Sequence, residues 1–308
     1  MPRSRLRVAL IALSVITVAS ILAALFVHQH RFAASEVKGL EERFLEAYAH
    51  DPEFREAVES LRRMVLDPEA EFDRGRAFEL FNLILSKLGL PSMPPEYFNW
   101  GKSVSSKAGA PPPPVACGPP PQLVLRIVQP AVDVEAGNGV EGVYACSFST
   151  DGATAVEVTV VFGDEDRGSP GSTEDLWYDA WRLVSWGRIK DVETFYVVLS
   201  EQGDYVKFQG LALVLNRTLG LRSVAPIGSG GAGFSTSAHR EGLEAFSGPA
   251  LTLYVNTWNH ALSTVDANPE LEKRVYTYNL SGVSVASRVD VENTLSTLRY
   301  ASEVRLRP

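Results

Sequence analysis

The chain has 308 residues and a net charge of −8, with 45% hydrophobic and 21% charged residues. This is the composition of globular protein, with enough length for about two domains. No extended run of Lys or Arg follows the first seven residues, which argues against binding to nucleic acid or docking on anionic lipid.

An unbroken apolar stretch without a charge covers Val8–Val27. One helix of this length spans the ~30 Å hydrocarbon core of a bilayer. Arg3, Arg5 and Arg7 precede it, and positive flanks stay on the cytoplasmic side. We therefore expect residues 1–31 to form a cytoplasmic tip and a transmembrane anchor, with the bulk of the chain outside the cytoplasm. A cleaved secretory signal is the alternative, and it too exports the rest of the chain.

Residues 32–100 have the apolar spacing of helices. Asp51-Pro52-Glu53 and Asp67-Pro68-Glu69 each place a capping acid and a proline where a helix should begin. The last of these helices, predicted over Pro68–Leu88, is apolar almost all round near its end, so neighbouring helices or a partner must cover it. We expect a small helical region beside the membrane, serving as a spacer or as a surface for self-association.

Residues 101–122 are rich in proline and predict a semi-rigid linker in the polyproline II conformation. Residues 123–308 then alternate as strands do, and we expect strands at 123–128, 143–148, 156–162, 192–199, 206–215 and 251–255. Ser172–Trp186 has helical spacing after a capping serine. The predicted fold is α+β, with a mostly antiparallel, β-sandwich-like domain at residues 123–308.

The chain has two cysteines, Cys117 in the linker and Cys146 in an early strand. Outside the cytoplasm such a pair is expected to form a disulfide. Closing the loop between the two cysteines would stabilise the fold by roughly 3.5 kcal/mol, because it lowers the entropy of the unfolded chain. Two buried free thiols are the alternative, and two cysteines alone cannot form a structural zinc site.

Asp191 and Glu193 lie on one face of the strand predicted at 192–199, together with its apolar residues. Carboxylates on that face need a cation, a metal or a shared proton. Arg188 and Lys190 are near in sequence and could supply the cation.

A second polar group follows the strand at 251–255, where Asn256, Trp258 and Asn259 could form a ligand-binding rim next to His260. A hydrogen-bonded strand end is the alternative. If the two groups meet, Asp191, Glu193 and His260 could hold a divalent metal.

Asp-x-Glu before an apolar strand, followed later by His260-Ala261, resembles a pattern in secreted β-sandwich proteins of the necrosis-inducing and vacuolar-sorting-like families. Val192 stands where that pattern has tryptophan. For the necrosis-inducing group the resemblance, over about residues 177–261, implies a metal-centred site that binds lipid at a membrane.

Three further features of the sequence bear on function. The glycine spacing in residues 228–233 matches that of a dinucleotide-binding loop, but the strands before and after it do not match that fold. A flexible loop is the simpler interpretation. Asn216 and Asn279 lie in acceptor sequons for N-glycosylation. No common hydrolase or phosphate-loop motif occurs.

Two functional hypotheses follow. The first is a non-catalytic extracytoplasmic module that binds a partner or an envelope component. The second is a metal- or ligand-dependent site, perhaps hydrolytic, at Asp191, Glu193 and His260. The missing nucleophile and base motifs favour the first.

Overall fold

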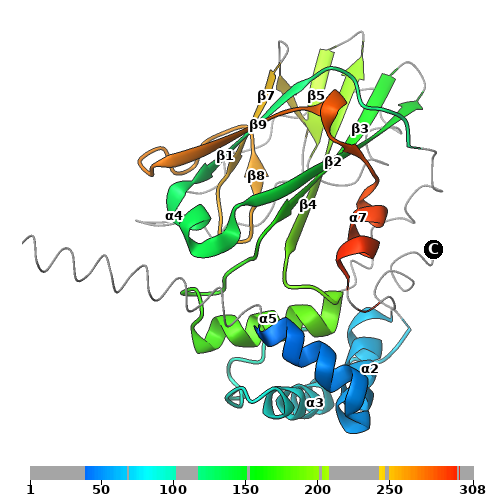
Figure 1. Cartoon of the computed structure of the whole chain (residues 1–308), viewed down its shortest axis with the longest axis vertical. Coiled ribbons are helices and arrows are strands. Elements are labelled where there is room, and N and C mark those ends of the chain that lie inside the picture. Colours follow the sequence, from blue (N-terminus) through cyan, green and yellow to red (C-terminus); the bar gives the residue numbers. More distant parts are fainter. Residues whose placement is uncertain are drawn as a thin grey trace, which may run out of the picture.

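The computed structural model describes residues 39–67, 69–101, 117–150, 153–200, 203–207, 243–246, 250–296 and 298 (Figure 1). The predicted anchor at Val8–Val27 and most of the proline-rich linker lie outside these residues. Within them, no helix combines the length and apolar character needed to cross a bilayer.

The helical region contains a helix over residues 39–50, α2 (Pro52–Leu66) and α3 (Arg74–Lys87). Helix α2 begins as predicted, because the Asp51 side chain accepts hydrogen bonds from the first free backbone amides. The predicted start of the next helix at Pro68 is wrong. Asp67 instead closes a turn by accepting from the backbone N–H of Glu69 at 2.9 Å, and Asp73 caps α3.

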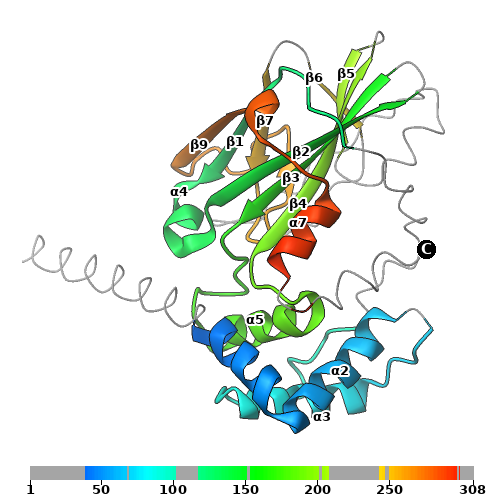
Figure 2. The same ribbon diagram turned by 45° about the vertical axis from the view of Figure 1, so that its right-hand side comes forward.

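The described strands form two sheets, both mostly antiparallel. One sheet has the order β8-β7-β1-β9 and the other the order β10-β2-β3-β4-β5-β6 (Figure 2). Their bounds are β1 Val124–Pro130, β2 Val140–Thr150, β3 Ala153–Phe162, β4 Asp191–Ser200, β5 Gly203–Lys207, β6 Leu243–Phe246, β7 Ala250–Val255, β8 Leu262–Ser263, β9 Lys273–Asn279 and β10 Ser284–Val285.

Residues of the two sheets share one apolar core, and we call the two packed sheets the sandwich. The prediction of a mostly antiparallel, β-rich part of the chain is confirmed. Every second residue of β3 enters this core, from Val156 to Phe162. Phe195 and Val197 of β4 share it, and Asp191 continues the same face to the end of the strand. The strand period thereby places two carboxyl side chains, Asp191 and Glu193, in line with this apolar row.

Short helices accompany the sandwich. They are α4 (Ala131–Asp133), the π-helical turn η1 (Val134–Asn138), α5 (Thr173–Trp186), the 3₁₀ turn η2 (Leu280–Gly282) and α7 (Arg288–Leu295). Helix α5 is confirmed where the sequence predicts it: the Ser172 side chain caps its first turn and Gly187 ends it at φ 69°. A side chain at Gly187 would also meet Ser296 Oγ at 2.5 Å.

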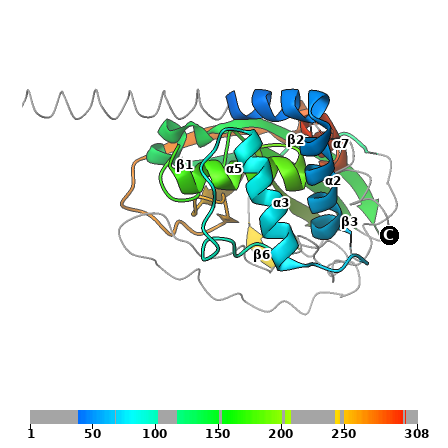
Figure 3. The same ribbon diagram turned by 90° about the horizontal axis from the view of Figure 1, so that it is seen from below.

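Helix α5 lies between the sandwich and the helical region (Figures 1 and 2), and in the view from below α3 crosses in front of it (Figure 3). Trp181 stacks on Trp100 at 4.7 Å between ring centroids, and its ring meets Phe81 and Phe98 edge-on. The Arg62 guanidinium donates to the Val184 carbonyl at 2.7 Å. The apolar side of α3 is therefore covered by α2 and by a helix from the β-rich part of the chain.

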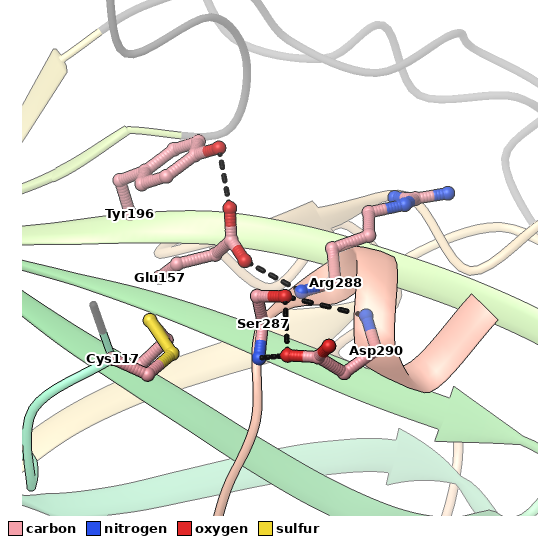
Figure 4. Close-up of a disulfide and its surroundings, with 7 residues drawn as sticks. Cys117, Glu157, Tyr196, Ser287, Arg288 and Asp290 are labelled. Carbon is pink, nitrogen blue, oxygen red and sulfur yellow. Dashed lines mark hydrogen bonds between the residues drawn. A yellow bond between two sulfur atoms is a disulfide. The ribbon is translucent and has the colours of Figure 1, made fainter. Parts of the chain in front are cut away.

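Cys117 and Cys146 form a disulfide with Cα atoms 5.0 Å apart, which confirms the predicted pairing. A backbone bridge between Gly118 and Ser147 runs beside it. Figure 4 shows the bond next to the start of α7, where Ser287 and Asp290 cap the helix reciprocally. The bond thus ties the end of the proline-rich linker to strand β2.

We predict that Trp181→Ala lowers the free energy of unfolding by about 3–5 kcal/mol, because it opens a cavity among three aromatic rings. Urea denaturation of the purified full-length protein measures the change. Leu45→Ala, at a half-exposed position, is the control and should cost less than about 0.5 kcal/mol. Equal losses in the two variants would contradict a core shared with α5.

We also predict that replacing Cys117 and Cys146 together by serine lowers the free energy of unfolding by roughly 3.5 kcal/mol. Wild-type protein unfolded in the presence of a reductant should behave like the double variant. Free thiols in the unreduced protein, detected by intact mass after alkylation, would contradict a disulfide between Cys117 and Cys146.

Candidate functional site

A buried polar group lies where α4, α5, the first residue of β4 and the turn after β7 meet. It consists of Asp133, Arg182, Asp191 and His260, and we call it the polar centre. Asp133, Arg182 and His260 are completely buried, and Asp191 is 5% exposed. Charged groups at such depth must be paired, because water cannot solvate them.

The turn after β7 aims His260 inward. His260 has φ 50°, the one non-glycine residue with positive φ in the described part of the chain. Its backbone N–H donates to the Thr257 carbonyl at 3.0 Å, and the Thr257 hydroxyl accepts from Ala261 N at 2.8 Å. Left-handed backbone costs a non-glycine residue of order 1–3 kcal/mol, so the interactions of the imidazole must offset this strain.

The His260 imidazole lies between two carboxylates. Nδ1 is 2.9 Å from Asp191 Oδ2, and Nε2 is 3.4 Å from Asp133 Oδ2. The ring stacks on Phe162 with centroids 3.9 Å apart. Burial alone would lower the pKa of His260, but the two carboxylates outweigh it and raise that pKa to about 10. The imidazole is therefore protonated at neutral pH, with a hydrogen bond to Asp191 and an ion pair with Asp133.

Arg182, from the middle of α5, is the second cation of the polar centre. Its guanidinium contacts Glu165 Oε2 at 3.0 Å and Asp191 Oδ1 at 3.4 Å, and it lies over the rings of Tyr178 and Trp186. Burial raises the pKa of Asp191, but the hydrogen bond from His260 and the charge of Arg182 lower it well below its usual value. Asp191 is thus an anion held by two cations.

The prediction that Asp191 and His260 meet is confirmed. Glu193, on the same face of β4, has a pKa raised well above its usual range by burial and by the charge of Asp191. The expected ion pair of Asp191 with Arg188 or Lys190 is wrong. Arg188 pairs with Glu292 and Lys190 with Glu141, whereas Arg182, nine residues away in sequence, pairs with Asp191.

The predicted rim residues have a different environment from the one expected of a ligand site. Asn256 is buried, and its amide donates to Val265 O and accepts from Ala267 N, each at 2.9 Å, so it holds the following loop in place. Trp258 packs against the sandwich core, and Asn259 is half-buried. Asn279 is exposed at the end of β9. Asn216 and the glycines of 228–233 lie outside the described residues.

Sequence reasoning missed Arg182 and Asp133. Arg182 follows Asp175 and Asp179 at helical spacing, and this polar stripe on α5 could have indicated it. Asp133 lies in a single turn of α4 after a strand, where nothing in the pattern singles it out. Asp133 also accepts from Asn138 Nδ2 at 3.1 Å, which fixes it in place.

An acidic loop follows β3 and continues the polar centre. Gly163 allows its close approach, because a side chain there would meet the Gly137 carbonyl at 2.2 Å. Glu165 pairs with Arg182, and Asp166 accepts from Asn138 Nδ2 at 2.6 Å. Burial raises the pKa of Asp164 to about 7 and that of Asp166 to about 8. Carboxyl groups therefore outnumber cations around α5.

The positions of the His, Cys, Asp and Glu side chains show whether they could act together as metal ligands. Across the described part of the chain, no three His, Cys, Asp or Glu side chains are arranged around one point as metal ligands. Both nitrogens of His260 face carboxylates.

Comparison with known proteins gives no match: no family model, curated protein or solved structure resembles the chain.

We predict that stability depends on the protonation of His260. The pKa is about 10 in the folded protein and ~6.5 in an unfolded chain, so the stabilisation is complete below about pH 6.5 and is lost as pH rises through about 10. The difference in unfolding free energy between wild type and His260→Gln should therefore shrink from pH 7 to pH 10. Urea denaturation at a series of pH values measures it, and a constant difference would contradict a charged imidazole.

Proposed function

We propose that this protein is a membrane-anchored extracytoplasmic binding module and that its polar centre stabilises the fold rather than catalysing a reaction. One observation carries the proposal: the cations and carboxylates of the polar centre are buried and paired with one another. A catalytic group must touch its substrate, and an accessible acid or base is the usual sign of such a site.

Two features support the location. The disulfide is of a kind that persists in oxidising compartments outside the cytoplasm. The apolar segment Val8–Val27 with arginines before it has the features of an anchor with a cytoplasmic amino terminus. The helical region would then lie between the membrane and the sandwich.

The second candidate is a metal- or ligand-dependent site at Asp191, Glu193 and His260. The contact of 2.9 Å between Asp191 and His260 favours it, as does the resemblance to the secreted β-sandwich families. It requires a metal to replace the proton that His260 shares with Asp191, because a ligating imidazole must be deprotonated at the bound nitrogen.

We predict that Asp191→Asn and His260→Gln each lower the free energy of unfolding by about 3–5 kcal/mol, because each leaves a buried charge without its partner. Metal content, measured by mass spectrometry of the purified full-length protein, should be the same in wild type and variants. Glu270→Gln, at an exposed position, is the matched control and should change neither quantity.

The outcomes separate the two candidates. A stoichiometric metal in wild type that Glu193→Gln abolishes would establish the metal site and overturn a purely structural polar centre. The location has its own test, in which protease is added to membrane vesicles of known orientation. Cleavage of the β-rich part only in vesicles that expose the cytoplasmic face would overturn the extracytoplasmic assignment.

A further inference from the structure

Strand β9 is an edge of the four-stranded sheet, and in the described part of the chain only β1 pairs with it. Figure 2 shows β9 at the outer side of this sheet, beyond β1. The other edge strands are short: β8 and β10 have two residues each and β6 has four, whereas β9 has seven. An open edge of that length presents a row of backbone N–H and C=O groups with which another chain can pair.

The hydrogen bonds to β1 identify which backbone groups of β9 face outward. Just after the strand, the Leu280 N–H donates to the Leu123 carbonyl at 2.9 Å, and the pairing with β1 continues along β9 without a shift of register. Because every second residue of an antiparallel strand bonds to its partner, the even-numbered residues of β9 are those bonded to β1. The N–H and C=O groups of Val275 and Thr277 therefore point away from β1, along the open edge.

The side chains along this edge suit strand pairing. Tyr276 and Tyr278 pack against the sandwich core, so Val275 and Thr277 lie on the opposite, outer face of the sheet. Val275 is 59% exposed, and Thr277 is exposed as well. Both are β-branched, as strands prefer, and no charged residue stands between Val275 and Asn279 to block an approaching chain.

The two cations at the start of β9 are already paired with carboxylates of the same chain. Lys273 Nζ is 2.9 Å from Asp266 Oδ1. The Arg274 guanidinium is 3.1 Å from Glu272 and 3.4 Å from Glu135. Two such edges would therefore not repel each other, whereas an acidic peptide would have to displace these carboxylates. The charges thus favour a second copy of this chain as the partner.

We propose that two copies of this chain pair antiparallel through β9, with Tyr276 of each copy at the twofold axis. This register brings all seven residues of the strand into the pairing. Val275 then lies opposite Thr277 of the second copy, and the outward N–H and C=O groups of the two residues bond to each other. Lys273 lies opposite Asn279 of the second copy, so no like charges meet.

The contact is isologous, since the same strand serves in both copies, and it joins the two four-stranded sheets into one continuous sheet. One pair of strands buries less surface than a standard protein interface. We therefore expect a weak dimer whose population rises with protein concentration.

The test is sedimentation velocity of the purified full-length protein in detergent micelles over a wide range of concentrations, which measures the dissociation constant of the dimer. Val275→Lys combined with Thr277→Lys should raise that constant at least about tenfold, because both symmetric cross-strand pairs then join two cations. Val275→Lys combined with Thr277→Glu is the matched control. It should return the constant to within about threefold of wild type, because the same pairs then join opposite charges.

Val275→Pro is the variant for use if a double variant does not fold, as judged by circular dichroism. It removes an N–H from the open edge without removing a hydrogen bond to β1, and it should abolish the dimer, whereas Val275→Thr keeps the N–H and should not.

A wild type that stays monomeric at every concentration would overturn the proposal. So would equal dissociation constants for the two double variants, because another surface, such as the helical region, would then hold the dimer. Either result leaves the proposed role of the polar centre standing, since β9 contributes no residue to it.

Discussion

The fold depends on a chain of buried charges that runs from Asp133 through His260 and Asp191 to Arg182. These residues come from four places in the sequence: α4, the turn after β7, the start of β4 and helix α5. Taking the charges out of water is costly, and only their mutual pairing offsets that cost. Displacing any one of the four elements would therefore leave a buried charge without its partner.

Helix α5 connects this chain of charges to the rest of the molecule because its two faces differ. Trp181 and Val184 belong to the core shared with the helical region, whereas Arg182 pairs with Asp191 of the sandwich. The helix thus belongs to an apolar core on one side and to an ionic group on the other. A substitution on either face of α5 should lower the stability of both the helical region and the sandwich, because both pack against the same 14 residues.

Local patterns predicted the elements better than they predicted their contacts. The alternation along β3 and the serine cap of α5 depend only on residues that are close in sequence, and both elements form where expected. The core-facing position of Asp191 followed from the strand period. The strand period did not predict which cation pairs with Asp191. Arg188 and Lys190 are nearer in sequence, but Arg182 makes the ion pair because α5 passes beneath the end of β4 (Figure 1). The short strands β8 and β10 depend on partners that no local pattern encodes.

The disulfide determines how tension would pass through the protein. Cys117 precedes β1 in the chain but is bonded to Cys146 on β2, which lies inside the six-stranded sheet between β10 and β3. A pull on the chain before Cys117 therefore acts on both sheets at once through covalent bonds. Strand β1 cannot be peeled away from that end unless β2 moves with it, so mechanical load from this side is resisted by the whole sandwich rather than by one strand.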